Sequence, residues 1–251
     1  MAKDIAHLMR EWEYDPENTV RFIEGDDGRQ ILQVRLPLGI EQYELDGRPD
    51  GMEPGGRETI LEGIEEKTNA FIAQHGEDGG FSIDHEDFVL MQNEGILFYY
   101  RYLLLFQIGD YERTCRDTEH NLRICSLVEK YCTNTEDRKS LLQYKPYIIR
   151  VNALSRSMLL LGKNEKQRAL AAISSAIEEI ESGEMISSMV YKFERDRSLE
   201  QLRGTLKQLD KLGGGEVERL QAQLEEAVAN EDYERAARLR DKILTLRNEQ
   251  G

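Results

Sequence analysis

The chain has 251 residues, of which 39% are hydrophobic, enough to bury one large or two small cores. Its formal net charge is −15, and residues 1–80 carry most of it, with 19 acidic against 8 basic side chains. Nucleic acids bind chiefly through Lys and Arg, so direct, strong nucleic-acid binding is not expected.

Three features of the sequence bear on cellular location. Residues Met1–Arg10 do not form a basic, apolar leader, so we expect no secretion. The most apolar stretch, residues 95–109, is too short to cross a bilayer and carries Arg101 in its middle. Cys115, Cys125 and Cys132 form no C-x-x-C pair and leave an odd thiol in any disulfide scheme. We therefore expect a cytoplasmic protein that makes no membrane contact.

The N-terminal segment, residues 1–56, mixes a short helical stretch with β-type sequence. Residues 19–38 contain two runs rich in β-branched residues, separated by "EGDDG", which predicts a β-hairpin turning at Asp27-Gly28. Residues 39–58 hold five glycines and two prolines, which predicts a long irregular loop. That loop could contact a partner or be a plain surface loop, and the sequence leaves both open.

Residues 57–212 have helical periodicity. The expected helices start near Arg57 and then cover residues 85–108, 111–131, 136–161, 165–181 and 187–212, with Pro146 kinking or interrupting the helix at 136–161. Residues 85–108 are apolar nearly all round, which favours a buried central helix, with an aromatic ligand box as the alternative. The aromatic residues concerned are Phe98, Tyr99, Tyr100, Tyr102 and Phe106.

The joints between helices share one pattern. Gly109 suits a left-handed helix end, and Asp110 can cap the next helix. Gly162 and Asn164, with Gln167 three residues later, predict the same arrangement with a capping box. Asn230 and Asp232 predict it a third time, so the repeated tetrad Asp-Tyr-Glu-Arg at 110–113 and 232–235 is interpreted as turn chemistry.

Gly213–Gly215 are expected to be a linker, and residues 216–249 a separate two-helix unit. An apolar stripe on the first helix consists of Val217, Leu220, Leu224 and Val228. One side of the second helix carries Tyr233, Ala236, Ala237, Arg240 and Ile243. A unit of about 35 residues buries too little apolar surface to be stable alone. Its remaining stripe therefore predicts a partner.

The sequence "EDYERAARLRDKI", preceded by L-x-x-x-L-x-x-A, resembles the UVR motif, the helical hairpin named after UvrB and UvrC. The matching residues are Leu220, Leu224, Ala227, Tyr233, Glu234, Ala236, Ala237, Leu239, Arg240, Asp241 and Ile243. In that family the hairpin is a protein-interaction module that pairs with another UVR hairpin or docks on a partner domain. The resemblance covers residues 216–249 alone. The rest of the chain lacks the G-x-x-x-x-G-K-[ST] loop and the Cys-x-x-Cys pairs of other proteins that carry the motif.

Catalytic and metal-binding patterns are weak. The four histidines, His7, His75, His85 and His120, belong to no metal or triad motif, and acids beside them suit helix surfaces and caps. Cys125 and Cys132 are interpreted as buried structural thiols. We expect no enzyme, no cofactor and no metal. A hydrolase that uses the 39–58 loop remains a distant alternative.

Together these observations predict a mainly α-helical protein: a helical-hairpin array or bundle with a small N-terminal β-hairpin segment and a C-terminal two-helix UVR hairpin. The expected function is that of an adaptor that binds itself, as a homo-oligomer, or a protein partner. The alternative is an accessory factor in nucleotide excision repair that acts through UvrB- or UvrC-like proteins. The expected partner-binding residues are Leu224, Tyr233, Ala236, Ala237, Arg240 and Asp241.

Overall fold

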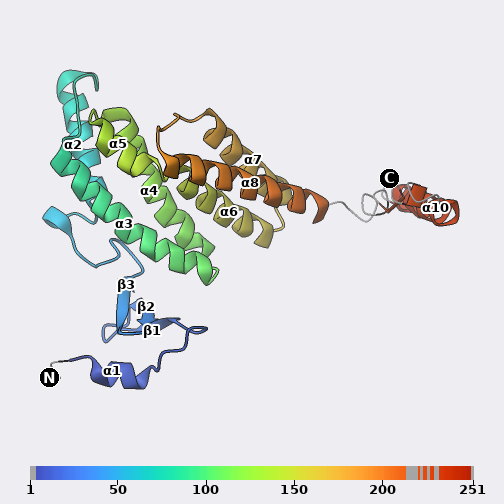
Figure 1. The fold of residues 1–251 in the computed structure, drawn as a ribbon, viewed down its shortest axis with the longest axis horizontal. Coiled ribbons are helices and arrows are strands. Elements are labelled where there is room, and N and C mark those ends of the chain that lie inside the picture. The colour runs from blue at the N-terminus through green and yellow to red at the C-terminus, as the bar shows by residue number, and fades with distance from the viewer. Residues whose placement is uncertain (1–3, 213–219, 221–222, 225–226, 229–231, 250–251) are drawn as a thin grey trace.

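The computed structural model describes residues 4–212, 220, 223–224, 227–228 and 232–249 (Figure 1). The chain runs from an N-terminal sheet through a helical array to a C-terminal hairpin. The predicted linker Gly213–Gly215 lies outside the described residues. Among the residues described, no helix combines the length and the apolar character needed to cross a membrane.

The sheet has three antiparallel strands in the order β1-β2-β3, preceded by the short helix α1, Ala6–Glu11. The strands are β1, Val20–Glu24, β2, Gln30–Leu36, and β3, Gly39–Glu44. The turn between the first two strands has Gly28 at φ +81°, which confirms the predicted hairpin.

The expectation of an irregular loop over residues 39–58 was wrong at its start, because residues 39–44 form strand β3. Leu36 pairs with Gly39 across a two-residue turn, and Leu32 pairs with Tyr43. Tyr43 and Leu45 then pack with Leu32 and with Leu105 of the helical array. Burial against this neighbouring surface stabilises the strand despite its polar sequence, and periodicity alone does not reveal it.

In the described part of the chain, the helical array consists of seven helices. They are α2, Ile60–His75, α3, His85–Gln107, α4, Tyr111–Tyr131, α5, Thr135–Leu142, α6, Lys145–Gly162, α7, Lys166–Ser182, and α8, Met189–Leu212. Helix α4 packs on both α3 and α6, and α6 packs on α7 and α8, so successive helices stack side by side (Figure 1). Pro146 lies in the first turn of α6, where its missing N–H costs no hydrogen bond, and the predicted interruption is confirmed between α5 and α6.

The joints confirm the predicted capping in part. Gly109 has φ +81°, and the Asp110 carboxylate accepts a hydrogen bond from the Arg113 N–H at 3.1 Å. At the next joint the prediction was wrong. Asn164 itself takes the left-handed conformation, at φ +59°, and α7 begins without a side-chain cap. Asparagine tolerates this conformation through local hydrogen bonding of its short amide, so Asn164 ends α6 and Gly162 remains within that helix.

Helix α3 is less buried than its composition suggested. Phe98, Tyr102 and Leu105 are buried, whereas Ile96 and Tyr100 are 44% and 49% exposed. Helix α4 covers one side of α3, and the opposite side has no comparable partner within the described chain. The expectation of a central, fully buried helix was therefore wrong, and part of its apolar surface faces solvent.

Arg101 of α3 fixes the sheet to the array. Its guanidinium pairs with the Asp117 carboxylate of α4 at 2.6 and 2.8 Å, and both side chains are fully buried. The same guanidinium donates to the carbonyl oxygens of Glu44 and Gly47 at 2.7 and 2.9 Å. A buried charge is tolerated when its donors are satisfied in this way. The turn that follows β3 is thus held against α3 and α4.

Candidate functional site

The C-terminal hairpin turns at Asp232, which precedes helix α10, Tyr233–Glu249. The Asp232 carboxylate accepts a hydrogen bond from the Arg235 N–H at 3.1 Å, which confirms its predicted capping role. The Asp232 N–H donates to the carbonyl oxygen of Ala227 at 2.8 Å and joins the two arms of the hairpin. Asn230, the other residue predicted to act here, lies outside the described residues, as does Val217.

Among the described residues of the hairpin, four apolar side chains are buried. Leu220 and Ala227 come from the first arm, and Ala236 and Ile243 come from α10. Ala227 and Ala236 are small residues, a composition that permits two helices to approach closely. The hairpin therefore has an interior of its own, and Ala236 belongs to it rather than to the outer surface.

The outer face of α10 carries most of the predicted partner-binding residues. Tyr233 is 69% exposed, and Ala237, Arg240 and Asp241 are exposed as well. Leu244, which the sequence analysis did not select, is 53% exposed. Residues 233, 237, 240 and 244 follow helical spacing and form one continuous stripe. We call Tyr233, Ala237, Arg240 and Leu244 the outer stripe.

The first arm of the hairpin adds to the exposed apolar surface. Val228 is 51% exposed, although its spacing with Leu220 and Leu224 had suggested a common stripe, and Leu224 is half-buried. Spacing could not separate Val228 from its neighbours, because both faces of this short arm carry apolar residues. The spacing from Tyr233 to Leu244 was the available signal for the outer stripe.

Charges on α10 are paired locally. The Arg240 guanidinium lies 3.0 Å from the Asp241 carboxylate, and Arg238 pairs with Glu234 one turn away. Exposed pairs of this kind contribute little to stability, typically under about 1 kcal/mol. The side chains of Arg240 and Asp241 can therefore exchange these partners for those of another surface at small cost.

Outside the hairpin, the buried carboxylate of Glu94 holds neighbouring elements together. Glu94 of α3 is fully buried and accepts hydrogen bonds from the N–H groups of Ile60 and Leu61 at 2.7 and 3.0 Å. Its carboxylate also lies 3.2 Å from His120 Nε2 and 3.3 Å from an Arg48 nitrogen. Burial raises the pKa of Glu94, but the hydrogen bonds outweigh burial and the net pKa is lowered. This carboxylate binds the N–H groups in the first turn of α2, so its contacts fix the position of that helix.

The three cysteines are free and buried, as expected for Cys125 and Cys132. Burial raises the pKa of both Cys115 and Cys125 to about 12, so these thiols stay protonated and unreactive at neutral pH. Among the described residues, no cluster of three or more His, Cys, Asp or Glu side chains has the arrangement to hold a metal ion.

Comparison with known proteins identifies the hairpin. Residues 214–249 match the family model of the UvrB/uvrC motif, UVR. No curated protein and no solved structure matches the chain significantly. Residues 214–249, which include the outer stripe, are therefore a UVR motif, the motif named after UvrB and UvrC.

Proposed function

We propose that this protein is a non-enzymatic adaptor that binds itself or a protein partner through its C-terminal UVR hairpin. The observation that carries the proposal is the outer stripe. Tyr233 and Leu244 expose large apolar side chains on a module that has already buried its own interior residues. Clustered exposed apolar surface on a small helical module is typical of protein–protein contact sites.

A second hairpin of the same kind would cover the outer stripe. Two helical hairpins can close into a four-helix bundle, in which the apolar faces of all four helices meet. Tyr233 is suited to the centre of such an interface, because interface energies concentrate on a few aromatic and Arg anchors. Ala237 beside it is small enough to let a partner helix approach. This supports a homo-oligomer, or a heteromer with another protein that carries the motif.

The charge distribution supports a protein partner over nucleic acid. The net charge of −15 repels phosphate backbones, and the arginines of α10 are partly neutralised by Glu234 and Asp241. The buried ionic groups of the array, Glu94 with His120 and Arg101 with Asp117, are engaged in fixing α2 and the sheet. We infer that the array acts as a scaffold for the hairpin and that no chemistry takes place at these groups.

A second candidate function follows from the family name. Because the motif is that of UvrB and UvrC, the chain could serve nucleotide excision repair as an accessory factor that acts through UvrB- or UvrC-like proteins. Stoichiometric, salt-resistant binding of duplex DNA by the isolated protein would favour this candidate. The adaptor proposal instead predicts weak DNA binding that salt abolishes.

The proposal is tested by affinity purification of the full chain beside the same chain ending at Leu212. The full chain should capture a stoichiometric partner, or an untagged copy of itself when the two are co-expressed, and the shortened chain should capture neither. The single substitution Thr245→Glu is a matched control, since it adds a charge to an exposed position on another face of α10. Equal capture by the full and shortened chains would refute the adaptor proposal.

A further inference from the structure

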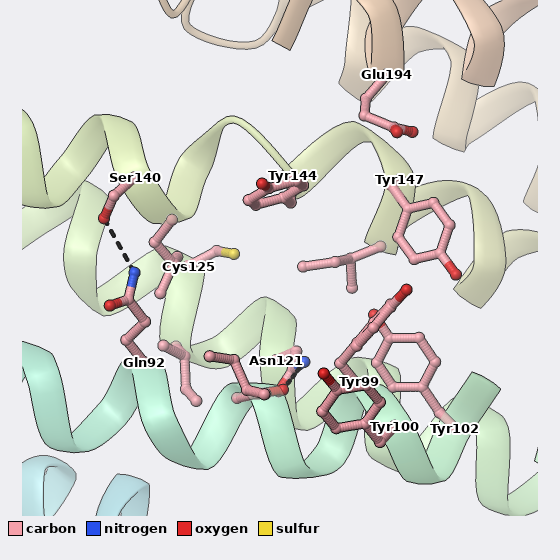
Figure 2. Close-up of a pocket in the computed structure, with 15 residues that line it drawn as sticks. Gln92, Tyr99, Tyr100, Tyr102, Asn121, Cys125, Ser140, Tyr144, Tyr147 and Glu194 are labelled. Carbon is pink, nitrogen blue, oxygen red and sulfur yellow. Dashed lines mark hydrogen bonds between the residues drawn. The ribbon is translucent and has the colours of Figure 1, made fainter. Parts of the chain in front are cut away.

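A cavity of about 430 Å³ opens between α3 and the segment that joins α5 to α6 (Figure 2). Helix α4 supplies its floor through Asn121, Ile124 and Cys125. A hydrogen bond of 3.0 Å from the Gln92 amide to the Ser140 hydroxyl spans one end. The volume lies within the range of about 300–1,000 Å³ that is typical of small-molecule sites.

Five tyrosines surround the cavity. Tyr99, Tyr100 and Tyr102 come from α3, and Tyr144 and Tyr147 face them from the other side (Figure 2). The aromatic box considered from the sequence is thus formed in part, but without Phe98 and Phe106. Phe98 stacks on His120, and Phe106 packs against Tyr111.

The rings are set at steep angles to one another around Tyr99. Its centroid lies 5.5 Å from that of Tyr102 at 88°, and 6.0 Å from that of Tyr147 at 62°. Tyr100 lies 5.4 Å away at 54°. Rings arranged in this way present faces and edges around one corner of the cavity. The negative face of an aromatic ring attracts a cation, and several rings around one point add their effects.

Glu194 of α8 is the charged residue among those that line the cavity in the described chain. Its Oε2 atom is buried and has no hydrogen-bond partner in the described part of the protein. Leaving a buried carboxylate oxygen without a donor is unfavourable, and an incoming ammonium group would supply the missing donor together with a positive charge. No Lys or Arg is among the described residues that line the cavity, so an anionic ligand would contact no basic side chain of that lining.

Two bases outside the cavity lining, Arg150 of α6 and Arg197 of α8, act electrostatically on Tyr147, and Arg150 also interacts with Glu194. The Arg150 guanidinium carbon lies 4.9 Å from the centroid of Tyr147, and the Arg150 side chain is buried. Because Arg150 offsets part of the field of Glu194, the expected preference for a cation is modest, on the order of tenfold. Burial raises the pKa of Tyr147 to about 12, so its ring stays neutral in any experiment near neutral pH.

We propose that this cavity binds a small organic cation, an alkylammonium group on a short apolar body. The ammonium lies against the faces of Tyr99 and Tyr147 with Glu194 as its counter-charge, and the apolar body contacts Ile96 and Ile148. This site is separate from the UVR hairpin and independent of the adaptor function. An adaptor with such a site would carry a ligand-binding pocket within its scaffold.

The test uses two probes of the same shape that differ in charge. Choline carries a trimethylammonium group, and 3,3-dimethylbutan-1-ol has a neutral tert-butyl group in its place. Tyrosine ring resonances of the full chain are followed during titration with each. Choline should shift the resonances of the cavity tyrosines and bind roughly tenfold more tightly than the alcohol. Equal binding of the two probes, or no binding of choline, would overturn the proposal.

Two variants and one control locate the site. Glu194→Gln should weaken choline binding by roughly tenfold and leave the alcohol unaffected, and Tyr147→Leu should weaken choline by roughly fivefold. Glu200→Gln, an exposed substitution six residues along α8, should change neither. A thermal melt confirms that each variant is folded, and Glu194→Gln alone decides the outcome if Tyr147→Leu fails to fold. Choline binding that is insensitive to Glu194→Gln would refute the site.

A third probe distinguishes a free ligand from a basic side chain on a protein. Nα-acetyl-lysine N-methylamide presents a primary ammonium on a peptide-like body. Choline should bind at least as tightly as this compound if the cavity serves a small free cation. Clear preference for the lysine derivative, abolished by Glu194→Gln, would overturn the small-molecule assignment in favour of a basic peptide.

Discussion

Arg101 joins three parts of the molecule through one guanidinium group, since it binds Asp117 of α4 and two carbonyl oxygens of the turn after β3. Replacing it with Gln leaves Asp117 buried beside Arg116 alone and removes the donors to Glu44 and Gly47. We expect Arg101→Gln to lower the free energy of unfolding by about 3–5 kcal/mol, the usual effect of breaking a buried ion pair.

Urea unfolding measures this loss. The control is Arg123→Gln, because Arg123 pairs with Glu65 on the surface with its side chain 57% exposed. That variant should lose under about 1 kcal/mol. A loss of similar size in both variants would show that Arg101 does not fix the sheet to the array.

His85 gives the array a dependence on pH. Its Nδ1 lies 2.9 Å from the Asp137 carboxylate of α5, and hydrogen bonding to that carboxylate raises the pKa of His85 above its ordinary value. The protonated imidazole is therefore favoured in the folded state. The resulting stability is fully present below about pH 6.5, the ordinary pKa of histidine, and is lost as the pH rises through the raised value.

We expect the difference in melting temperature between the wild type and His85→Gln to be largest near about pH 6 and to shrink towards about pH 9. His75→Gln is the matched control, because the His75 ring bonds a carbonyl of its own helix and has no carboxylate partner in the described chain. A wild-type advantage that grows with pH would contradict the assignment.

Residue-level features were predictable where the physics is local. Asp110 and Asp232 cap their helices as their positions in the sequence suggested, because a cap requires a short polar side chain and the next turn. The buried pair of Arg101 and Asp117 was not predictable. Its partners come from two helices and a distant turn, and no spacing in the sequence links them.

At the scale of elements, the joint between α6 and α7 depends on Asn164. At φ +59° an Ala side chain pays the steric cost of the left-handed conformation, whereas Gly does not. We expect Asn164→Ala to lower stability by about 1 kcal/mol and Asn164→Gly to leave it nearly unchanged, as measured by urea midpoints. Lys163→Ala, at φ −94°, is the control. Equal losses in the Ala and Gly variants would indicate a side-chain contact instead.

The burial of helix α3 and the presence of strand β3 could not be predicted correctly from the sequence. Composition predicted the type of α3 correctly but overestimated its burial, because burial depends on which faces α4 and the neighbouring helices cover. Strand β3 has a polar sequence, and its pairing with β2 and contact with Leu105 stabilise it. The exposed side of α3 that burial prediction missed is the side that contributes Ile96 and Tyr100 to the cavity.

For the whole molecule, the sequence predicted a helical array followed by a C-terminal hairpin. The residues of that hairpin also indicated its motif. The structure adds the division of that hairpin into an interior with Ala236 and an outer stripe with Tyr233. The spacing of Ala236 and Ala237 could not tell which of these neighbours faces the interior, because the packing of the first arm decides it. The identity of the partner depends on the complementary surface of another molecule, which this sequence does not contain.

The central claim is that the outer stripe associates with a partner surface. Its most direct test is native mass spectrometry of the full chain and of the double variant Tyr233→Ala with Ala237→Glu, each with a thermal melt. The wild type should be a dimer or a stable heteromer with a protein that carries the same motif. The double variant should be monomeric with an unchanged melting temperature, because loss of a buried aromatic anchor costs about 2 kcal/mol of binding, roughly thirtyfold in affinity. A wild-type monomer without a partner, or a variant that melts earlier with the same oligomeric state, would contradict the claim.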